Sequence, residues 1–110
     1  MENVIVRYKL KPGTVDENEQ LVKEVYKELS LEEPEGFSYA TYKLEDGLTF
    51  IHVASHEPGS RNPLPGLPTF KNFQAGIKDR CDELPIVNHV TEIGSYRAER
   101  KTVKEASDEG

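Results

Sequence analysis

The sequence predicts an α+β domain with the ferredoxin-like order βαββαβ, a four-stranded antiparallel sheet with two helices on one face. Three observations indicate this fold. Apolar residues alternate in four segments, they recur every three or four residues in two others, and an Asp-Gly pair lies between the middle two strands. Because both helices cover the same face, the other face of the sheet is left bare. We therefore expect a second copy of the chain to cover it, giving a homodimer.

The composition indicates one domain and excludes several kinds of partner. We place the domain at residues 1–96 and a charged tail at 97–110. The 14 basic and 20 acidic residues give a net charge of −6, which argues against nucleic acid and anionic membranes. No apolar run is long enough to span a membrane, and no leader is expected. A single cysteine, Cys81, excludes an internal disulfide and favours a cytoplasmic location.

The first strand is predicted at residues 4–10 and stops at a Lys-Pro-Gly turn. Its alternation predicts that one face carries Val4, Val6, Tyr8 and Leu10. A helix should follow from Thr14, whose hydroxyl is expected to form a capping box with Glu17. The apolar stripe of this helix consists of Asn18, Leu21, Val22, Val25, Tyr26 and Leu29.

Residues 37–44 and 48–55 are predicted to form a β-hairpin around residues 45–47. The sequence leaves open whether the loop has two or three residues, and the choice shifts the pairing by one residue. A three-residue loop is preferred because it places similar side chains opposite one another. That register pairs Leu44 with Leu48, Tyr42 with Phe50, and Ala40 with His52.

Residues 56–68 hold four prolines and cannot form the interior of a helix or sheet. This long loop is either a lid or binding wall, or a dimer contact in which Leu64 and Leu67 pack on the other subunit. Thr69 is expected to cap a second helix, and a fourth strand is predicted at 86–96. The apolar stripe of the second helix consists of Phe70, Phe73, Gln74, Ile77 and Cys81.

His52 is the strongest candidate for chemistry, because it lies in the middle of an apolar strand and imidazole accepts protons near neutral pH. The alternative is a hydrogen-bonded histidine within the dimer interface. Tyr8, Tyr39 and Tyr42 could line a pocket for an aromatic compound, or be ordinary strand residues. The histidines lack the spacing of metal ligands, so no metal is expected.

The segments 4–13, 50–55 and 70–81, in this order and in a chain of this length, resemble the antibiotic biosynthesis monooxygenase-like superfamily. The resemblance covers residues 1–96. It implies a homodimeric α/β barrel, in which two sheets meet through their uncovered faces and each subunit keeps a pocket between sheet and helices. Such proteins include cofactor-free oxygenases, haem-degrading enzymes and proteins without an established activity. The haem-degrading branch is disfavoured, because this chain has no tryptophan and has Val6 where that branch would have asparagine.

The resemblance implies a small-molecule protein, either a cofactor-independent oxygenase of an aromatic or quinol-like compound or a non-catalytic ligand-binding or stress-response dimer. Whether it is an enzyme stays open at this point. In the oxygenase interpretation His52 accepts a proton and the Tyr8 hydroxyl orients the substrate. Tyr42, Phe50 and Phe73 are the expected substrate contacts, and neither a metal nor an organic cofactor is expected.

Overall fold

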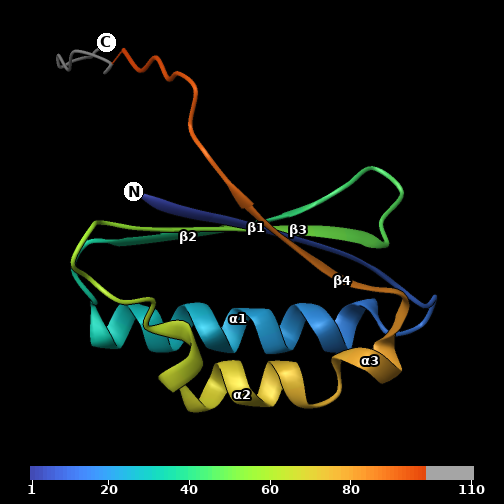
Figure 1. Cartoon of the computed structure of the whole chain (residues 1–110). Helices are drawn as coiled ribbons and strands as arrows, with labels where there is room; N and C mark the ends of the chain where they lie inside the picture. The colour runs from blue at the N-terminus through green and yellow to red at the C-terminus, as the bar shows by residue number, and fades with distance from the viewer. Residues whose placement is uncertain (99–110) are drawn as a thin grey trace, which may run out of the picture.

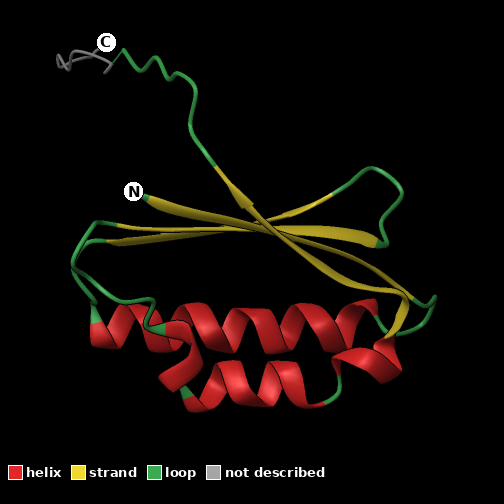
Figure 2. Cartoon of the chain, viewed as in Figure 1, coloured by secondary structure: helices red, strands yellow, loops and turns green. Residues whose placement is uncertain are grey.

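The computed structural model describes residues 1–98, which form one antiparallel sheet covered on one face by helices (Figures 1 and 2). The strands are β1 (Glu2–Leu10), β2 (Phe37–Lys43), β3 (Thr49–His56) and β4 (Cys81–Val90). The helices are α1 (Val15–Glu32), η1 (Leu64–Gly66, a 3₁₀ turn), α2 (Pro68–Ala75) and α3 (Ile77–Arg80). The strand order β2-β3-β1-β4 is that of a ferredoxin-like sheet, so the predicted fold class is confirmed.

The central strand β1 alternates as its sequence predicts. Tyr8 and Leu10 face the helices and are 2% and 0% exposed, whereas Arg7 is exposed on the opposite face. We call the two sides of the sheet the helix-side face and the open face. In an antiparallel pair, opposite residues share a face, so His52 and Thr41 join Val6 on the helix-side face.

Helix α1 lays the predicted stripe on the sheet, with Asn18, Val22 and Val25 buried. It begins after Thr14 as expected, but the predicted capping box is wrong. The Thr14 hydroxyl instead donates to the carbonyl oxygens of Lys11, at 2.8 Å, and Arg80, at 3.2 Å. This hydroxyl therefore ties the β1–α1 turn to the end of α3, and it is not directed at the amides of its own helix.

The preferred register of the β2–β3 hairpin is also wrong. Tyr42 pairs with Ile51 and Thr41 with His52, so the loop is formed by residues 45–48. Gly47, at φ 72°, ends a turn in which its amide donates to the Leu44 carbonyl, and the Asp46 carboxylate accepts the amides of residues 48 and 49. The pairing register is the one that a two-residue loop at 46–47 would give, but residues 45 and 48 also belong to the loop. The hydrogen bonds that Asp46 accepts in the turn favour this register over the one that places similar side chains opposite one another.

The second helical segment is shorter than its stripe predicts. It breaks at Gly76 into α2 and α3, and Cys81 is the first residue of β4, where it is buried. Strand β4 spans 81–90 and not 86–96; register shifts opposite β1 admit Pro85, since a bulge needs no ladder bond from proline. Thr69 does not cap α2: it lies inside the helix, and its hydroxyl donates to Glu28 of α1 at 2.6 Å.

The loop before α2 packs on its own subunit. Leu64 and Leu67 are 4% and 8% exposed and belong to the same core as Tyr8 and Phe73, so the alternative in which they pack on another subunit is wrong. After β4, residues 91–98 run away from the body of the domain without helix or strand (Figure 1). Most of the predicted tail, 99–110, lies outside the described residues.

Within residues 1–98, no helix has the length and apolar character that crossing a membrane requires.

We expect Leu10→Ala to lower the free energy of unfolding by about 2–5 kcal/mol, because it leaves a cavity at a fully buried position at the end of the interior strand β1. Urea denaturation followed by circular dichroism measures this change. Leu31→Ala is the matched control: Leu31 is 78% exposed on α1, and its removal should change stability by less than about 0.5 kcal/mol. Equal effects of the two substitutions would contradict the assignment of the core.

Candidate functional site

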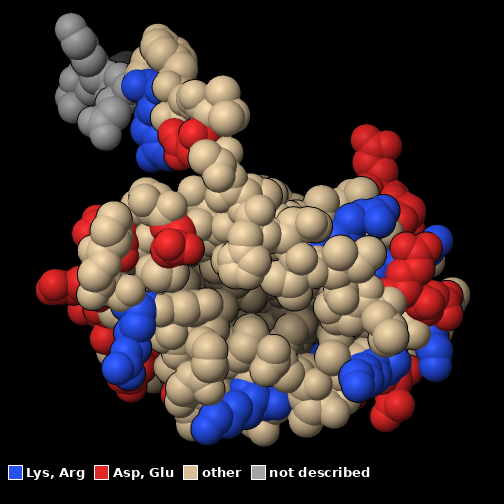
Figure 3. Space-filling model, in the orientation of Figure 1, with Lys and Arg blue, Asp and Glu red and all other residues tan. Residues whose placement is uncertain are grey.

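A cavity of about 170 Å³ lies between the helix-side face and α2. In the space-filling view the molecule is hollowed between its sheet and helix layers, and uncharged residues surround the hollow (Figure 3). The lining residues come from all four strands, the loop before α2, and helices α2 and α3. They are Val4, Val6, Tyr8, Tyr39, His52, Ala54, Asn62, Leu64, Phe70, Phe73, Gln74, Ile77, Pro85 and Val87.

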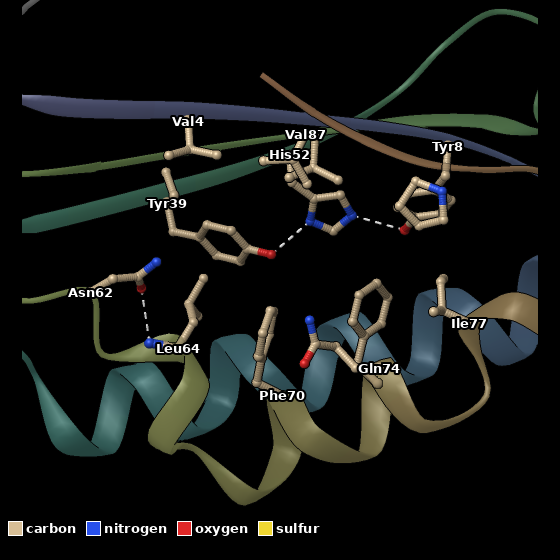
Figure 4. Close-up of a pocket in the computed structure, with 14 residues that line it drawn as sticks. Val4, Tyr8, Tyr39, His52, Asn62, Leu64, Phe70, Gln74, Ile77 and Val87 are labelled. Carbon is tan, nitrogen blue, oxygen red and sulfur yellow. Dashed lines mark hydrogen bonds between the residues drawn. The ribbon is translucent and has the colours of Figure 1, made fainter. Parts of the chain in front are cut away.

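Most of this lining is aliphatic or aromatic, and among the described residues no acidic or basic side chain other than His52 contributes to it. The polar groups of the sheet form a row in which His52 lies between Tyr39 and Tyr8 (Figure 4). Across the cavity, α2 directs the amide of Gln74 toward this row (Figure 4). An apolar pocket with a few converging polar groups is the usual form of a small-molecule site.

The fold holds the His52 ring at both nitrogens. The Nε2 atom lies 2.8 Å from the Tyr8 hydroxyl, and Nδ1 lies 2.7 Å from the Tyr39 hydroxyl and 3.0 Å from that of Thr41. The ring also stacks near Tyr8, with centroids 5.3 Å apart, and it contacts Phe73 at 5.5 Å. The imidazole is only 4% exposed. Strands β1, β2 and β3 therefore fix its orientation.

Burial keeps this row of side chains uncharged at neutral pH. It lowers the pKa of His52 to about 4, because the charged imidazolium loses its hydration. It likewise raises the pKa of Tyr8 and of Tyr39 well above the ordinary phenol value, the neighbouring hydrogen bonds opposing it only in part. The site therefore presents neutral donors and acceptors, and not the partly protonated imidazole that the reference pKa suggests.

The hydrogen-bonded row continues into the core. Asn18 Nδ2 donates to the Tyr8 oxygen at 2.9 Å, and Arg80 Nε donates to Asn18 Oδ1 at 3.0 Å. Both side chains are buried, at 0% and 4% exposed. At the other end, the Thr41 hydroxyl lies 2.8 Å from that of Tyr26 on α1.

Of the residues that the sequence offered for the site or its pocket, the structure brings Tyr8, Tyr39, His52 and Phe73 to the cavity wall. Phe50 lies behind the wall, where its ring stacks on that of Tyr8 with centroids 5.6 Å apart. Tyr42 is not part of the site: it is 59% exposed on the open face.

Sequence reasoning missed Asn18 and Arg80 as site residues. The only signal for Asn18 is a polar residue within the apolar stripe of a helix, and nothing nearby in the sequence marks Arg80. Among residues 1–98, no three side chains of His, Cys, Asp or Glu gather closely enough to hold a metal ion.

No family model and no curated relative matches this chain. Solved structures do match. Rv0793 from Mycobacterium tuberculosis is 20% identical, with a TM-score of 0.68 over 87% of this chain and 98% of that one. An antibiotic biosynthesis monooxygenase is 18% identical, with a TM-score of 0.67 over 86% of this chain and 100% of that one.

A conserved protein from Methanosarcina mazei Go1 is 21% identical, with a TM-score of 0.64 over 81% of this chain and 89% of that one. Identities at this level show a shared fold and do not transfer a reaction. This chain thus has the fold of structures that include an antibiotic biosynthesis monooxygenase, and the resemblance seen in the sequence is confirmed at the level of the fold.

Proposed function

We propose that the cavity binds an electron-rich aromatic compound of one ring that carries a hydroxyl group, and that the protein promotes oxidation of this compound by dioxygen without a metal or organic cofactor. One observation carries the proposal. The row Tyr39–His52–Tyr8 crosses one wall of an otherwise apolar cavity, and it offers a proton acceptor and hydroxyl groups to one face of a planar ligand.

The volume of the cavity supports a ligand of one ring. A dry apolar cavity of about 150 Å³ holds a benzene molecule, and this cavity measures about 170 Å³. Phe70 and Phe73 lie opposite the sheet and can contact the faces or edges of an aromatic ring. A tetrapyrrole is far larger than this space, which agrees with the sequence argument against a haem-degrading protein.

The chemistry required of the protein is the removal of a proton from the ligand hydroxyl. At neutral pH His52 is uncharged, so one of its ring nitrogens holds a lone pair that can accept a proton. Its lowered pKa makes it a weak base at rest. Negative charge that develops on the ligand oxygen raises that pKa in the same step, because the imidazolium gains a partner in a medium of low dielectric constant.

The proposed reaction balances without another reductant. A phenol with hydrogen at the para carbon reacts with one dioxygen to give the para-quinone and one water: one oxygen atom enters the ring carbon and the other leaves as water. The substrate supplies all four electrons that dioxygen takes up. The protein contributes a site that holds the ring, excludes water and accepts the hydroxyl proton.

We also propose that the chain works as a homodimer formed through the open face. That face bears aliphatic and aromatic residues that no helix within residues 1–98 covers. They are Ile5, Tyr42, Ile51, Val53, Ile86 and Val90, of which Tyr42 and Ile86 are 59% and 58% exposed. Exposed apolar surface of this kind is typical of an interface.

We expect His52→Gln to reduce dioxygen consumption with single-ring phenols that carry hydrogen at the para carbon by about 100-fold or more, because glutamine keeps polarity but cannot accept the proton. Tyr39→Phe should weaken binding of the same compounds by about three- to tenfold through loss of one hydrogen bond. An oxygen electrode and isothermal titration calorimetry measure the two effects. Tyr42→Phe is the control, since it removes the same hydroxyl on the open face and should change neither.

The second candidate function is binding without turnover. It is favoured by one observation: both nitrogens of His52 already have protein partners, as they would in a purely structural role. The same measurements separate the two functions. Saturable binding of phenols with no dioxygen uptake, under conditions that exclude product inhibition, would establish the binding protein and overturn the oxygenase.

Stability should depend on pH through His52. Its folded-state pKa of about 4 lies below the ordinary value of 6.5, so the unfolded chain binds the proton more readily in between. The contribution of His52 is complete above pH 6.5 and declines as the pH falls toward 4, by roughly 3 kcal/mol at most. Urea denaturation from pH 7 to 4 measures this loss. The His52→Gln variant should lack that part of it, whereas His56→Gln, which removes an imidazole outside the core, should retain it.

Sedimentation equilibrium should show a dimer at micromolar concentration. We expect Ile86→Glu to raise the dissociation constant by about 100-fold or more, because it places an unpaired carboxylate in the interface. Leu31→Glu, the same kind of change at a more exposed position on α1, should leave the dimer intact. A wild-type protein that sediments as a monomer would contradict the proposed assembly.

A further inference from the structure

Arg80 is a buried cation without a carboxylate partner. Its side chain is 4% exposed, and no acidic group within residues 1–98 lies within 4 Å of it. Its contacts are the Asn18 Oδ1 atom, the Phe73 carbonyl at 2.7 Å and the face of the Phe73 ring at 5.4 Å. Burying an arginine without a carboxylate partner costs free energy, which indicates that the guanidinium group has a role at this position.

A guanidinium group has only donors, and this fixes the amide of Asn18. Because Arg80 Nε can only donate, the atom of Asn18 that faces it must be the carbonyl oxygen. The NH₂ group of Asn18 therefore points the other way and donates to the Tyr8 oxygen. The amide orientation, which geometry alone often leaves ambiguous, is determined here by its neighbour.

The orientation of the Asn18 amide determines which atom donates in the hydrogen bond between Tyr8 and His52. The Tyr8 oxygen accepts from Asn18, and its other contact in this network is His52 Nε2, at 2.8 Å. A buried hydroxyl hydrogen needs an acceptor, so Tyr8 donates to Nε2 and that nitrogen carries no proton. A neutral imidazole has one N–H, which must then lie on Nδ1 and be donated to the Tyr39 or Thr41 oxygen.

We propose that Arg80 and Asn18 are positioning residues that select the tautomer of His52 protonated at Nδ1, and that they thereby leave the Tyr39 hydroxyl hydrogen available to an oxygen atom of a ligand in the cavity. Each hydrogen bond in the chain Arg80–Asn18–Tyr8–His52 runs in the same direction. The lone pair of Nε2 faces Tyr8, so a proton taken from a ligand reaches His52 through that hydroxyl: the ligand proton moves to the Tyr8 oxygen as the Tyr8 proton moves to Nε2. This part of the inference rests on the proposed function; the tautomer does not.

The test reverses the chain at Asn18. Asn18→Asp is nearly isosteric and gives Arg80 a carboxylate partner, but it turns the donor that faces Tyr8 into an acceptor. Tyr8 should then donate to Asp at position 18, and His52 Nε2 should carry the proton and donate to the Tyr8 oxygen. The nitrogen-15 and carbon-13 chemical shifts of the His52 ring, measured at pH 7 on the full chain, distinguish the two tautomers. We expect Nδ1–H in the wild type and Nε2–H in the variant.

Two further variants complete the experiment. Asn88→Asp makes the same chemical change on the open face and should keep the wild-type tautomer. Arg80→Gln allows either end of a side-chain amide to face Asn18, so both tautomers should be detected. An Nε2–H signal in the wild type overturns the inference, whether or not any variant folds, and so does an unchanged Nδ1–H signal in a folded Asn18→Asp protein.

Ligand binding gives a separate outcome. In Asn18→Asp the Tyr39 hydroxyl donates to Nδ1 and is lost to the ligand, so affinity for phenol itself should fall about three- to tenfold by calorimetry. A switched tautomer with unchanged phenol affinity would overturn the role given to Tyr39. A switched tautomer in a protein that binds no phenol would instead overturn the proposed function and leave the tautomer assignment standing.

Discussion

The structure depends on a buried imidazole whose two nitrogens must both be satisfied inside an apolar layer. His52 is only 4% exposed, so the protein itself must supply the hydrogen-bond partners of both ring nitrogens. Tyr8 comes from β1, Tyr39 and Thr41 come from β2, and α1 supports both ends of the row through Asn18 and Tyr26. The core is therefore held in one arrangement by hydrogen bonds whose geometry is far more selective than apolar contact.

This arrangement depends in turn on the register of one hairpin. If β2 shifted by one residue along β3, Thr41 would no longer lie opposite His52. The side chains of Tyr39 and Thr41 would then move to the open face. The Asp46 carboxylate opposes such a shift, because it accepts hydrogen bonds from the Thr49 hydroxyl and from the amides of residues 48 and 49. These bonds, led by that of the Thr49 hydroxyl, lower the pKa of Asp46 to about 2, so the carboxylate remains charged in neutral and mildly acidic solution. An exposed turn thus specifies a buried site.

Periodicity in the sequence predicted the strand faces and the order of the elements. It did not predict the features that depend on contacts between distant residues. Alternation placed Tyr8 on the buried face, and the order of segments gave the correct sheet. Tyr42 was assigned to the pocket because similarity of side chains favoured a register that Asp46 does not allow. Cys81 was assigned to a helix because the apolar spacing continued past Gly76, where the helix breaks. Arg80 lies 62 residues from Asn18 in the chain, and no local pattern reports such a pairing.

The distribution of charge explains why a neutral ligand is favoured over an anion. Within the part of the chain that the structure describes, the cavity wall has no acidic or basic side chain apart from His52, which burial keeps uncharged. The nearest buried cation in the network, Arg80, reaches the cavity only through two hydrogen bonds, by way of Asn18 and Tyr8. An anion entering from water would lose its hydration and gain no direct ion pair, whereas a neutral phenol loses little. Negative charge is then tolerated only after binding, when proton transfer to His52 creates a compensating cation beside it. A site built in this way admits its ligand uncharged and separates charge only after the ligand is bound in the apolar cavity.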